Sequence, residues 1–85
     1  MTGIYSSVEN LIIAELKKHS FHTFGKKECI IMYNDIIFHH EITENDFSQG
    51  LQSLVNKNLL IYKISDSDIK FYQLSDELKS MLDIE

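Results

Sequence analysis

The stretch TENDFSQGLQSLVNKNLLIY, residues 43–62, says most about the fold of this chain. Thr43 is a good N-cap, and the acidic residues just after it suit the positive end of a helix dipole. Apolar side chains then recur at helical spacing and form one stripe: Phe47, Leu51, Leu54 and Val55. At about 100° per residue, the opposite face carries only uncharged polar side chains: Asn45, Gln49, Gln52, Ser53 and Asn56. We therefore predict an amphipathic helix over residues 43–57, with Gly50 inside it where another backbone comes close.

Two strands and a short helix are predicted after this helix. Residues 59–65 and 69–74 are rich in β-branched and aromatic side chains, and Leu60, Tyr62 and Ile64 follow the two-residue period of a strand. The acidic sequence SDSD, residues 65–68, joins the strands as the tip of a hairpin. Ser75 then caps a last helix, whose inner face is expected to carry Leu78, Met81 and Leu82.

The N-terminal part of the chain is expected to begin with a helix. Ser6 and Glu9 have the spacing of a capping box, in which each side chain satisfies a free backbone N–H. Apolar residues follow at helical spacing: Val8, Leu11, Ile12 and Leu16. The outer face is predicted to hold Glu9, Asn10, Glu15 and Lys17. Residues 19–25 are interpreted as a connection that Gly25 closes.

Residues 28–40 allow two interpretations, a helix or a β-hairpin. The β-branched residues are typical of strands, and a hairpin would turn at Asn34 and Asp35. That turn, however, lacks the Gly that favours a two-residue hairpin loop. We favour the helix, which leaves Ile31 and Phe38 as apolar side chains on its outer side.

From Ile42 to Leu82 the sequence resembles the second half of small winged helix-turn-helix regulators. The segments that carry the resemblance are TENDF at 43–47, LQSLVNKNLLIY at 51–62 and FYQLSDEL at 71–78. In MarR-like and PadR-like regulators, a similar recognition helix runs into L-x-x-L-V-x-x-G-L-I, and the wing ends in Y-x-L-T. Asn58 stands here where these families usually have Gly, and Ser75 where they usually have Thr. Asn tolerates the left-handed conformation nearly as well as Gly, so the first departure is mild.

The resemblance implies an α+β fold. We expect a single domain over residues 1–85, a three-helix winged helix-turn-helix domain with a two-stranded β-hairpin wing and a short C-terminal helix.

The resemblance also implies a DNA-binding transcription regulator, with helix 43–57 as its recognition helix. Asn and Gln pair bidentately with adenine, so A·T-rich sites are expected to be read by Asn45, Gln49, Gln52, Ser53 and Asn56. Phosphate contacts are expected from Lys26, Lys27 and Lys57. Regulators of this kind generally pair to read two half-sites, which implies a homodimer. Candidate contact residues are Ile31, Phe38, Met81, Ile4, Tyr5 and Ile84.

The charge of the chain favours a different function. Thirteen acidic residues stand against eight Lys and no Arg, and the net charge of −5 comes entirely from residues 41–85. Proteins that bind nucleic acid usually carry a basic stripe. The predicted wing tip holds Asp66 and Asp68, where DNA-binding wings usually have Lys or Arg. The alternative is a winged-helix protein–protein interaction module, an adaptor or inhibitor whose acidic surface binds a basic protein partner and no DNA.

Catalytic and metal-binding motifs are not recognisable in the sequence. It has no Gly-rich phosphate loop, nucleophile elbow or HExxH segment, so we expect no enzymatic activity and no cofactor. The pair His19 and His22, the cluster His39-His40-Glu41 and the lone Cys29 have loose spacing, and we expect no metal site. With one Cys, no signal peptide and no long apolar run, the chain is expected to be a cytoplasmic protein without membrane contact.

Overall fold

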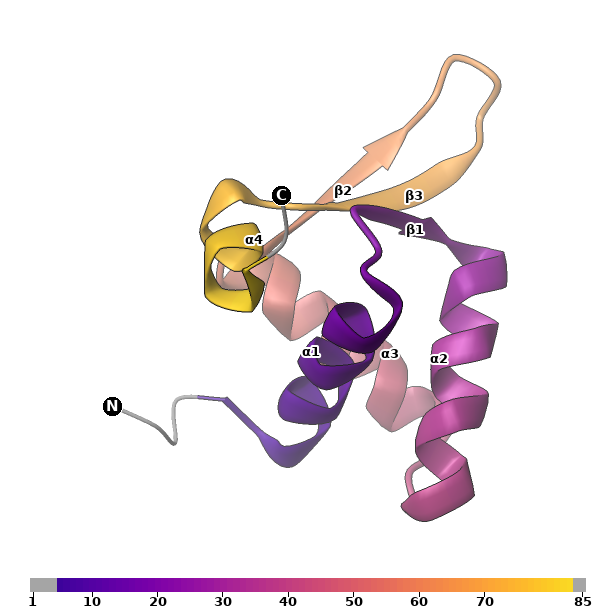
Figure 1. The fold of residues 1–85 in the computed structure, drawn as a ribbon. Helices are drawn as coiled ribbons and strands as arrows, with labels where there is room; N and C mark the ends of the chain where they lie inside the picture. The colour runs from indigo at the N-terminus through magenta and orange to yellow at the C-terminus, as the bar shows by residue number, and fades with distance from the viewer. Residues whose placement is uncertain (1–4, 84–85) are drawn as a thin grey trace.

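A computed structural model describes residues 5–83, and over this range the chain is an α+β structure (Figure 1). Four helices and a three-stranded antiparallel sheet follow in the order α1 (Ser7–His19), β1 (Thr23–Gly25), α2 (Lys26–His39), α3 (Glu44–Asn56), β2 (Leu60–Ile64), β3 (Lys70–Leu74) and α4 (Asp76–Leu82). Helices α1, α2 and α3 gather on one side of the sheet, and the loop end of the β2–β3 hairpin extends away from them (Figure 1). Within the described range, no helix combines the length and the apolar character needed to cross a membrane.

The predicted helix starts are confirmed. At α1, Ser6 Oγ accepts a hydrogen bond from the backbone N–H of Glu9 at 3.2 Å, and Glu9 Oε1 accepts one from the backbone N–H of Ser6 at 2.6 Å. Thr43 and Asp46 form the same reciprocal pair at α3, at 3.0 and 3.1 Å. Ser75 caps α4 with one such bond. Each cap satisfies backbone donors that the first turn leaves free, which fixes where each helix begins.

Residues 26–39 form one helix, so the hairpin interpretation of this segment is wrong. Glu28 Oε1 accepts a hydrogen bond from the backbone N–H of Gly25 at 2.8 Å and so closes the start of α2. Met32 and Ile36, one turn apart, are buried on the same face. The outward positions predicted for Ile31 and Phe38 are confirmed, since their side chains are 40% and 82% exposed.

The interpretation of residues 19–25 as a plain connection is wrong, because Thr23–Gly25 form strand β1. This strand pairs antiparallel with β3, with Thr23 opposite Gln73 and Gly25 opposite Phe71. The sheet order is therefore β1-β3-β2, three strands rather than the two that the sequence predicted. Three residues are too short to display a two-residue period, and β1 exists only because β3 offers it an edge.

One contiguous core lies between the helices and the sheet. Its buried members come from every element: Ile12, Leu16, Phe24, Met32, Ile36, Phe47, Leu51, Leu54, Leu59, Leu60, Leu74, Leu78 and Leu82. The inward position predicted for Met81 is wrong, since this side chain is 46% exposed. α4 is only seven residues long, and its turn buries Leu78 and Leu82, one turn apart, against the core.

The structure restricts the residue type at two positions, Gly50 within α3 and Asn58 after it. A Cβ at Gly50 would lie 2.8 Å from Ile12 Cδ1 and 2.9 Å from Val8 Cγ1. The close approach predicted at Gly50 is therefore real, but side chains of α1 make it and not a backbone. Asn58, two positions after the end of α3, adopts the left-handed conformation with φ 63°, as its place in the sequence predicted.

Replacing Gly50 with Ala is expected to destabilise the protein by roughly 1–2 kcal/mol. The methyl group gains about 1 kcal/mol of helix propensity, but overpacking against the buried Ile12 and the stiff Val8 costs more. Urea denaturation measures the change. Ser48→Ala, at an exposed position of α3, is the control and should be neutral or slightly stabilising. A Gly50→Ala protein as stable as the wild type would contradict this reading of the α1–α3 contact.

Candidate functional site

The polar face of α3 carries a strip of four exposed amides. These side chains, which we call the amide strip, are Asn45, Gln49, Gln52 and Asn56. At about 100° per residue they fall within a sector of roughly 60°, so they share one side of the helix. Gln52 Nε2 donates a hydrogen bond to Asn56 Oδ1 at 3.1 Å, which orients two amides relative to each other. The strip provides donors and acceptors side by side without any formal charge.

Ser53 and Lys57, also predicted to face a ligand, are instead engaged with Glu9 of α1. Ser53 Oγ donates to Glu9 Oε2 at 2.6 Å, and Lys57 Nζ lies 2.9 and 2.7 Å from the two carboxylate oxygens. Lys57 Nζ also lies 4.9 Å from the centre of the Tyr5 ring, within range of a cation–π interaction. The structure thus divides the five polar residues predicted on this face into four exposed amides and one half-buried hydroxyl.

The outward position predicted for Glu9 is wrong, since this residue is only 2% exposed. Burial alone would raise the pKa of its carboxyl group. The hydrogen bonds from Lys57, Ser53 and the backbone of Ser6 outweigh burial and hold the pKa at about 2. Glu9 is therefore ionised at neutral pH and ties the start of α1 to the end of α3.

The turn between α2 and α3 is fixed by Tyr33. Its hydroxyl donates a hydrogen bond to the backbone carbonyl of Ile42 at 3.1 Å, and its ring meets that of Phe47 edge to face, with 5.6 Å between centroids. A hollow of about 270 Å³ lies beside Tyr33 between the two helices, and Lys26 and Glu44 both line it. These contacts fix the angle at which α3 leaves α2.

Of the three predicted phosphate contacts, Lys26 and Lys27 are exposed at the start of α2. Lys57 holds Glu9, so its ammonium group is already paired. Exposed carboxylates stand at the start of α3, on Glu44 and Asp46. The surface around the amide strip therefore carries both signs of charge.

The β2–β3 hairpin presents apolar side chains and an acidic tip to solvent. Ser65 Oγ accepts hydrogen bonds from the backbone N–H groups of Ser67 and Ile69, at 3.3 and 3.2 Å, and so shapes the tip, where Asp66 and Asp68 are exposed. Strand β2 carries the exposed apolar residues Ile61, Tyr62 and Ile64, and Ile69 is exposed just before β3. Only the base of the hairpin is buried in the core, at Leu60 and Leu74.

The candidate dimer contacts that the structure describes lie on α2, on α4 and at Tyr5, just before α1. Ile31 and Phe38 are exposed on α2 together with Ile30 and Ile37, and Met81 is exposed on α4. Tyr5 is half-buried beside Lys57. Ile4 and Ile84 lie outside the described residues.

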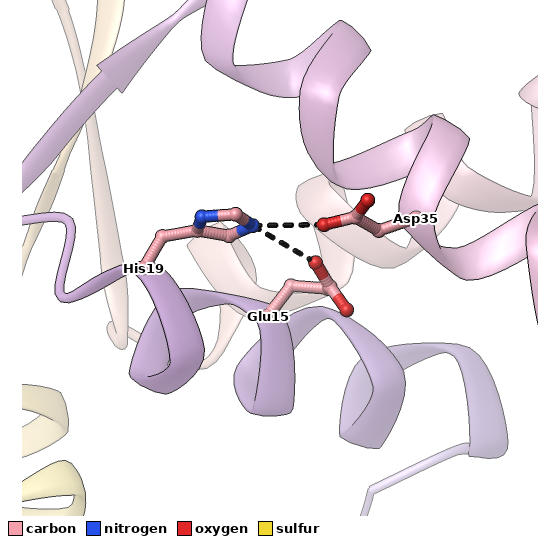
Figure 2. Close-up of side chains that lie close together, drawn as sticks. All are labelled: Glu15, His19 and Asp35. Carbon is pink, nitrogen blue, oxygen red and sulfur yellow. Dashed lines mark hydrogen bonds and ion pairs between the residues drawn. The ribbon is translucent and has the colours of Figure 1, made fainter.

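A second constellation, which the sequence analysis missed, joins α1 to α2. His19 Nε2 lies 2.9 Å from Asp35 Oδ2 and 3.3 Å from Glu15 Oε1. Figure 2 shows the imidazole of His19 directed at both carboxylates. The spacing of Glu15 and His19, one helical turn apart, is the signal that could have been used. We paired His19 with His22 instead, and His22, like His39 and His40, is exposed.

The two carboxylates of this cluster differ in their electrostatic environment. Burial, and then the neighbouring Asp35, raise the pKa of Glu15. Hydrogen bonds from His19 and then Lys18 lower the pKa of Asp35. Crowding two acids around one imidazole is unfavourable unless positive charge balances them, and Lys18 Nζ, 3.3 Å from Asp35, supplies part of it.

The ionised state of Glu9 predicts a loss of stability in acid. Its folded-state pKa of about 2 lies below the usual 4.5, so its contribution is complete above pH 4.5 and disappears as the pH falls toward 2. Glu9→Gln is expected to be less stable than the wild type at pH 7 by on the order of 2–3 kcal/mol, since the paired charge is missing. The difference between the two proteins should shrink to near zero at pH 2.

Urea denaturation of both proteins at several pH values between 7 and 2 measures this difference in unfolding free energy. The contributions of all other acids cancel, because the two proteins share them. Glu41→Gln, at an exposed position between α2 and α3, is the matched control and should keep the wild-type profile. A Glu9→Gln protein with the same acid profile as the wild type would show that Glu9 is not stabilised in its charged form.

Comparisons with known proteins give no information about either group of residues. Neither the amide strip nor the cluster of Glu15, His19 and Asp35 can be assigned by similarity. No family model, no curated protein and no solved structure matches this chain.

Proposed function

We propose that this chain is a small winged-helix transcription regulator that binds DNA and reads A·T-rich sites through α3. The observation that carries the proposal is the amide strip, exposed along one side of the helix. The order of the elements supports it, since α2 and α3 are joined by a short turn, as in a helix-turn-helix, and a hairpin follows α3, as a wing does. In this proposal α3 is the recognition helix and β2–β3 is the wing.

The chemistry of the strip suits adenine. The oxygen of an amide side chain accepts a hydrogen bond from the N6 amino group of adenine, while its NH₂ group donates one to N7. From Asn45 to Asn56 the strip extends about 16 Å along the helix axis at 1.5 Å per residue, which is long enough to follow several base pairs in the major groove. The hydrogen bond between Gln52 and Asn56 holds both groups ready for such contacts.

The electrostatics limit how strongly the chain can bind DNA of any sequence. Lys26 and Lys27 are the phosphate contacts that the proposal retains, because Lys57 is engaged with Glu9. Two phosphate contacts per subunit correspond, in a plot of log K against log salt concentration, to a slope of about −2 for one subunit and about −4 for a dimer on two half-sites. Low non-specific affinity and a shallow salt dependence are therefore part of the proposal.

Replacing Gln49 and Asn56 together with Ala is expected to abolish sequence preference while the chain stays folded, because both side chains are exposed. Fluorescence anisotropy with a pool of A·T-rich duplexes, at low and at higher salt, followed by sequencing of the bound fraction, measures affinity and preference. Lys26→Ala with Lys27→Ala should instead weaken binding to all sequences and flatten the salt slope.

Asn10→Ala, which removes an exposed amide from α1, is the control and should leave both affinity and preference unchanged. Sequence preference that survives the loss of Gln49 and Asn56 would overturn the role given to α3. Absence of binding even at low salt would overturn DNA binding altogether.

We also propose that the regulator is a homodimer that pairs through α2. Phe38 is the most exposed of the large apolar side chains among residues 5–83, and Ile31 is exposed on the same helix. A large contiguous apolar patch on a monomer marks an interaction surface, and on α2 such a patch is offered by Ile30, Ile31, Ile37 and Phe38 together. Pairing through α2 is compatible with two α3 helices that each read one half-site.

Phe38→Ser is expected to convert a dimer into a monomer, because it removes the largest apolar group of that surface without touching the core. Light scattering after size-exclusion chromatography measures the mass. Met81→Ser, on α4, is the matched control and should leave the dimer intact. A dimer lost with Met81→Ser and kept with Phe38→Ser would move the interface to α4, and a monomeric wild type would contradict pairing.

The second candidate function is a protein-interaction module that binds a basic partner. The observation that favours it is the hairpin, which combines exposed apolar side chains on its strands with Asp66 and Asp68 at its tip. A basic protein surface with an apolar patch is complementary to this arrangement, whereas phosphate is not. Failure of the DNA titration at low salt favours this candidate.

A further inference from the structure

The end of α1 and the middle of α2 bring three metal-ligating side chains together. Glu15 and His19 are four residues apart on α1 and so share one side of that helix, and Asp35 reaches them from α2 (Figure 2). One ligand atom from each residue lies within 4.8 Å of the other two. The side chains converge on one point beside His19 Nε2, as Figure 2 shows.

The distances suit a small ion with tetrahedral coordination. Zinc binds imidazole nitrogen and carboxylate oxygen at about 2.0–2.2 Å, which places neighbouring ligand atoms of a tetrahedron about 3.3–3.5 Å apart. The separation of 3.3 Å between His19 Nε2 and Glu15 Oε1 matches this length, whereas the 2.9 Å to Asp35 Oδ2 is a hydrogen-bond length and must widen by roughly 0.4 Å to admit the ion. Three protein ligands leave the fourth position for water or another ligand, and the side chain of Asp35, 34% exposed, leaves solvent access to the cluster.

One oxygen of the cluster, Glu15 Oε1, is left to be satisfied by a proton shared with Asp35 or by a cation. Glu15 Oε1 is fully buried and has no hydrogen-bond partner. Among residues 5–83, no other buried side-chain oxygen or nitrogen lacks one. It faces His19 Nε2, which carries at most one proton, and Asp35 lies closer to that proton. A cation in contact with all three atoms satisfies the nitrogen lone pair and both carboxylates at once.

The imidazole is already oriented for this role. The ring of His19 stacks on that of Phe21, with 5.0 Å between centroids and 11° between planes. The side chain of Glu15 is 13% exposed and that of His19 25%, so packing holds both. The charged group that competes for Asp35 is Lys18, whose side chain is 60% exposed and can swing into solvent.

We propose that Glu15, His19 and Asp35 form a binding site for a divalent first-row transition-metal ion, with Zn²⁺ as the probe. One nitrogen and two carboxylate oxygens form a mixed donor set that suits zinc and its neighbours better than the all-oxygen preference of Mg²⁺ or Ca²⁺. The two carboxylates balance the charge of the ion. Bound there, the ion joins α1 to α2 and stabilises the folded chain, since the unfolded chain does not hold the three ligands together.

Calorimetric titration of the full chain with Zn²⁺, without DNA, tests the site. We expect one ion per chain and a higher melting temperature with Zn²⁺ than with Mg²⁺. His19→Gln and Asp35→Asn should each weaken binding by at least roughly tenfold. Co²⁺ provides a second readout, because tetrahedral coordination produces strong visible absorption that these variants should lose.

The other histidines provide the controls. His22→Gln, and His39→Gln combined with His40→Gln, remove exposed imidazoles and should leave the affinity unchanged. Circular dichroism of each metal-free variant establishes that it is folded, so that loss of affinity reports on the ligands. Binding that survives in both His19→Gln and Asp35→Asn, binding lost only with His39 and His40, or no binding at submillimolar Zn²⁺ would overturn the proposal.

Discussion

The buried carboxylate of Glu9 is the interaction on which the arrangement of α1 and α3 depends. It completes the cap of α1 and at the same time accepts hydrogen bonds from Ser53 and Lys57 of the α3 end, at 2.6–2.9 Å. A buried charge without such partners costs several kcal/mol, so α3 must place Ser53 and Lys57 on Glu9 whenever it packs against α1. Gly50 allows the close contact between the same two helices. The amide strip is therefore carried on a helix whose position is tightly determined.

Helix α1 is held by polar groups at both ends. Its first turn is joined to α3 through Glu9, and its last turns approach α2 through Glu15, His19 and Asp35. Tyr33 completes the set by fixing the turn that leads from α2 into α3. Each pair among the three helices thus has a specific polar contact in addition to the shared core, and such contacts define one orientation where apolar packing alone tolerates several.

Local patterns in the sequence were enough to predict much of the fold. The caps at Ser6, Thr43 and Ser75 and the apolar stripe of α3 depend only on neighbouring residues, and the helices and the hairpin they predict are present. What could not be predicted depends on distant residues. β1 exists through its pairing with β3, Glu9 is buried because α3 covers it, and Asp35, the hydrogen-bond partner of His19, is on another helix. Periodicity placed Glu9 and Glu15 outside because it records polarity and not the neighbours that a side chain meets.

The sheet order β1-β3-β2 has a consequence for how the chain assembles. β2 and β3 are joined by a tip of a few residues, whereas Thr23 and Gln73, which face each other across β1 and β3, are 50 positions apart. Closing the long loop costs more chain entropy than closing the short one, and only three residues of β1 are available to offset it. The β1–β3 ladder is thus the most non-local pairing of the sheet, and its stability is tied to the packing of the helices that separate its two strands in the sequence.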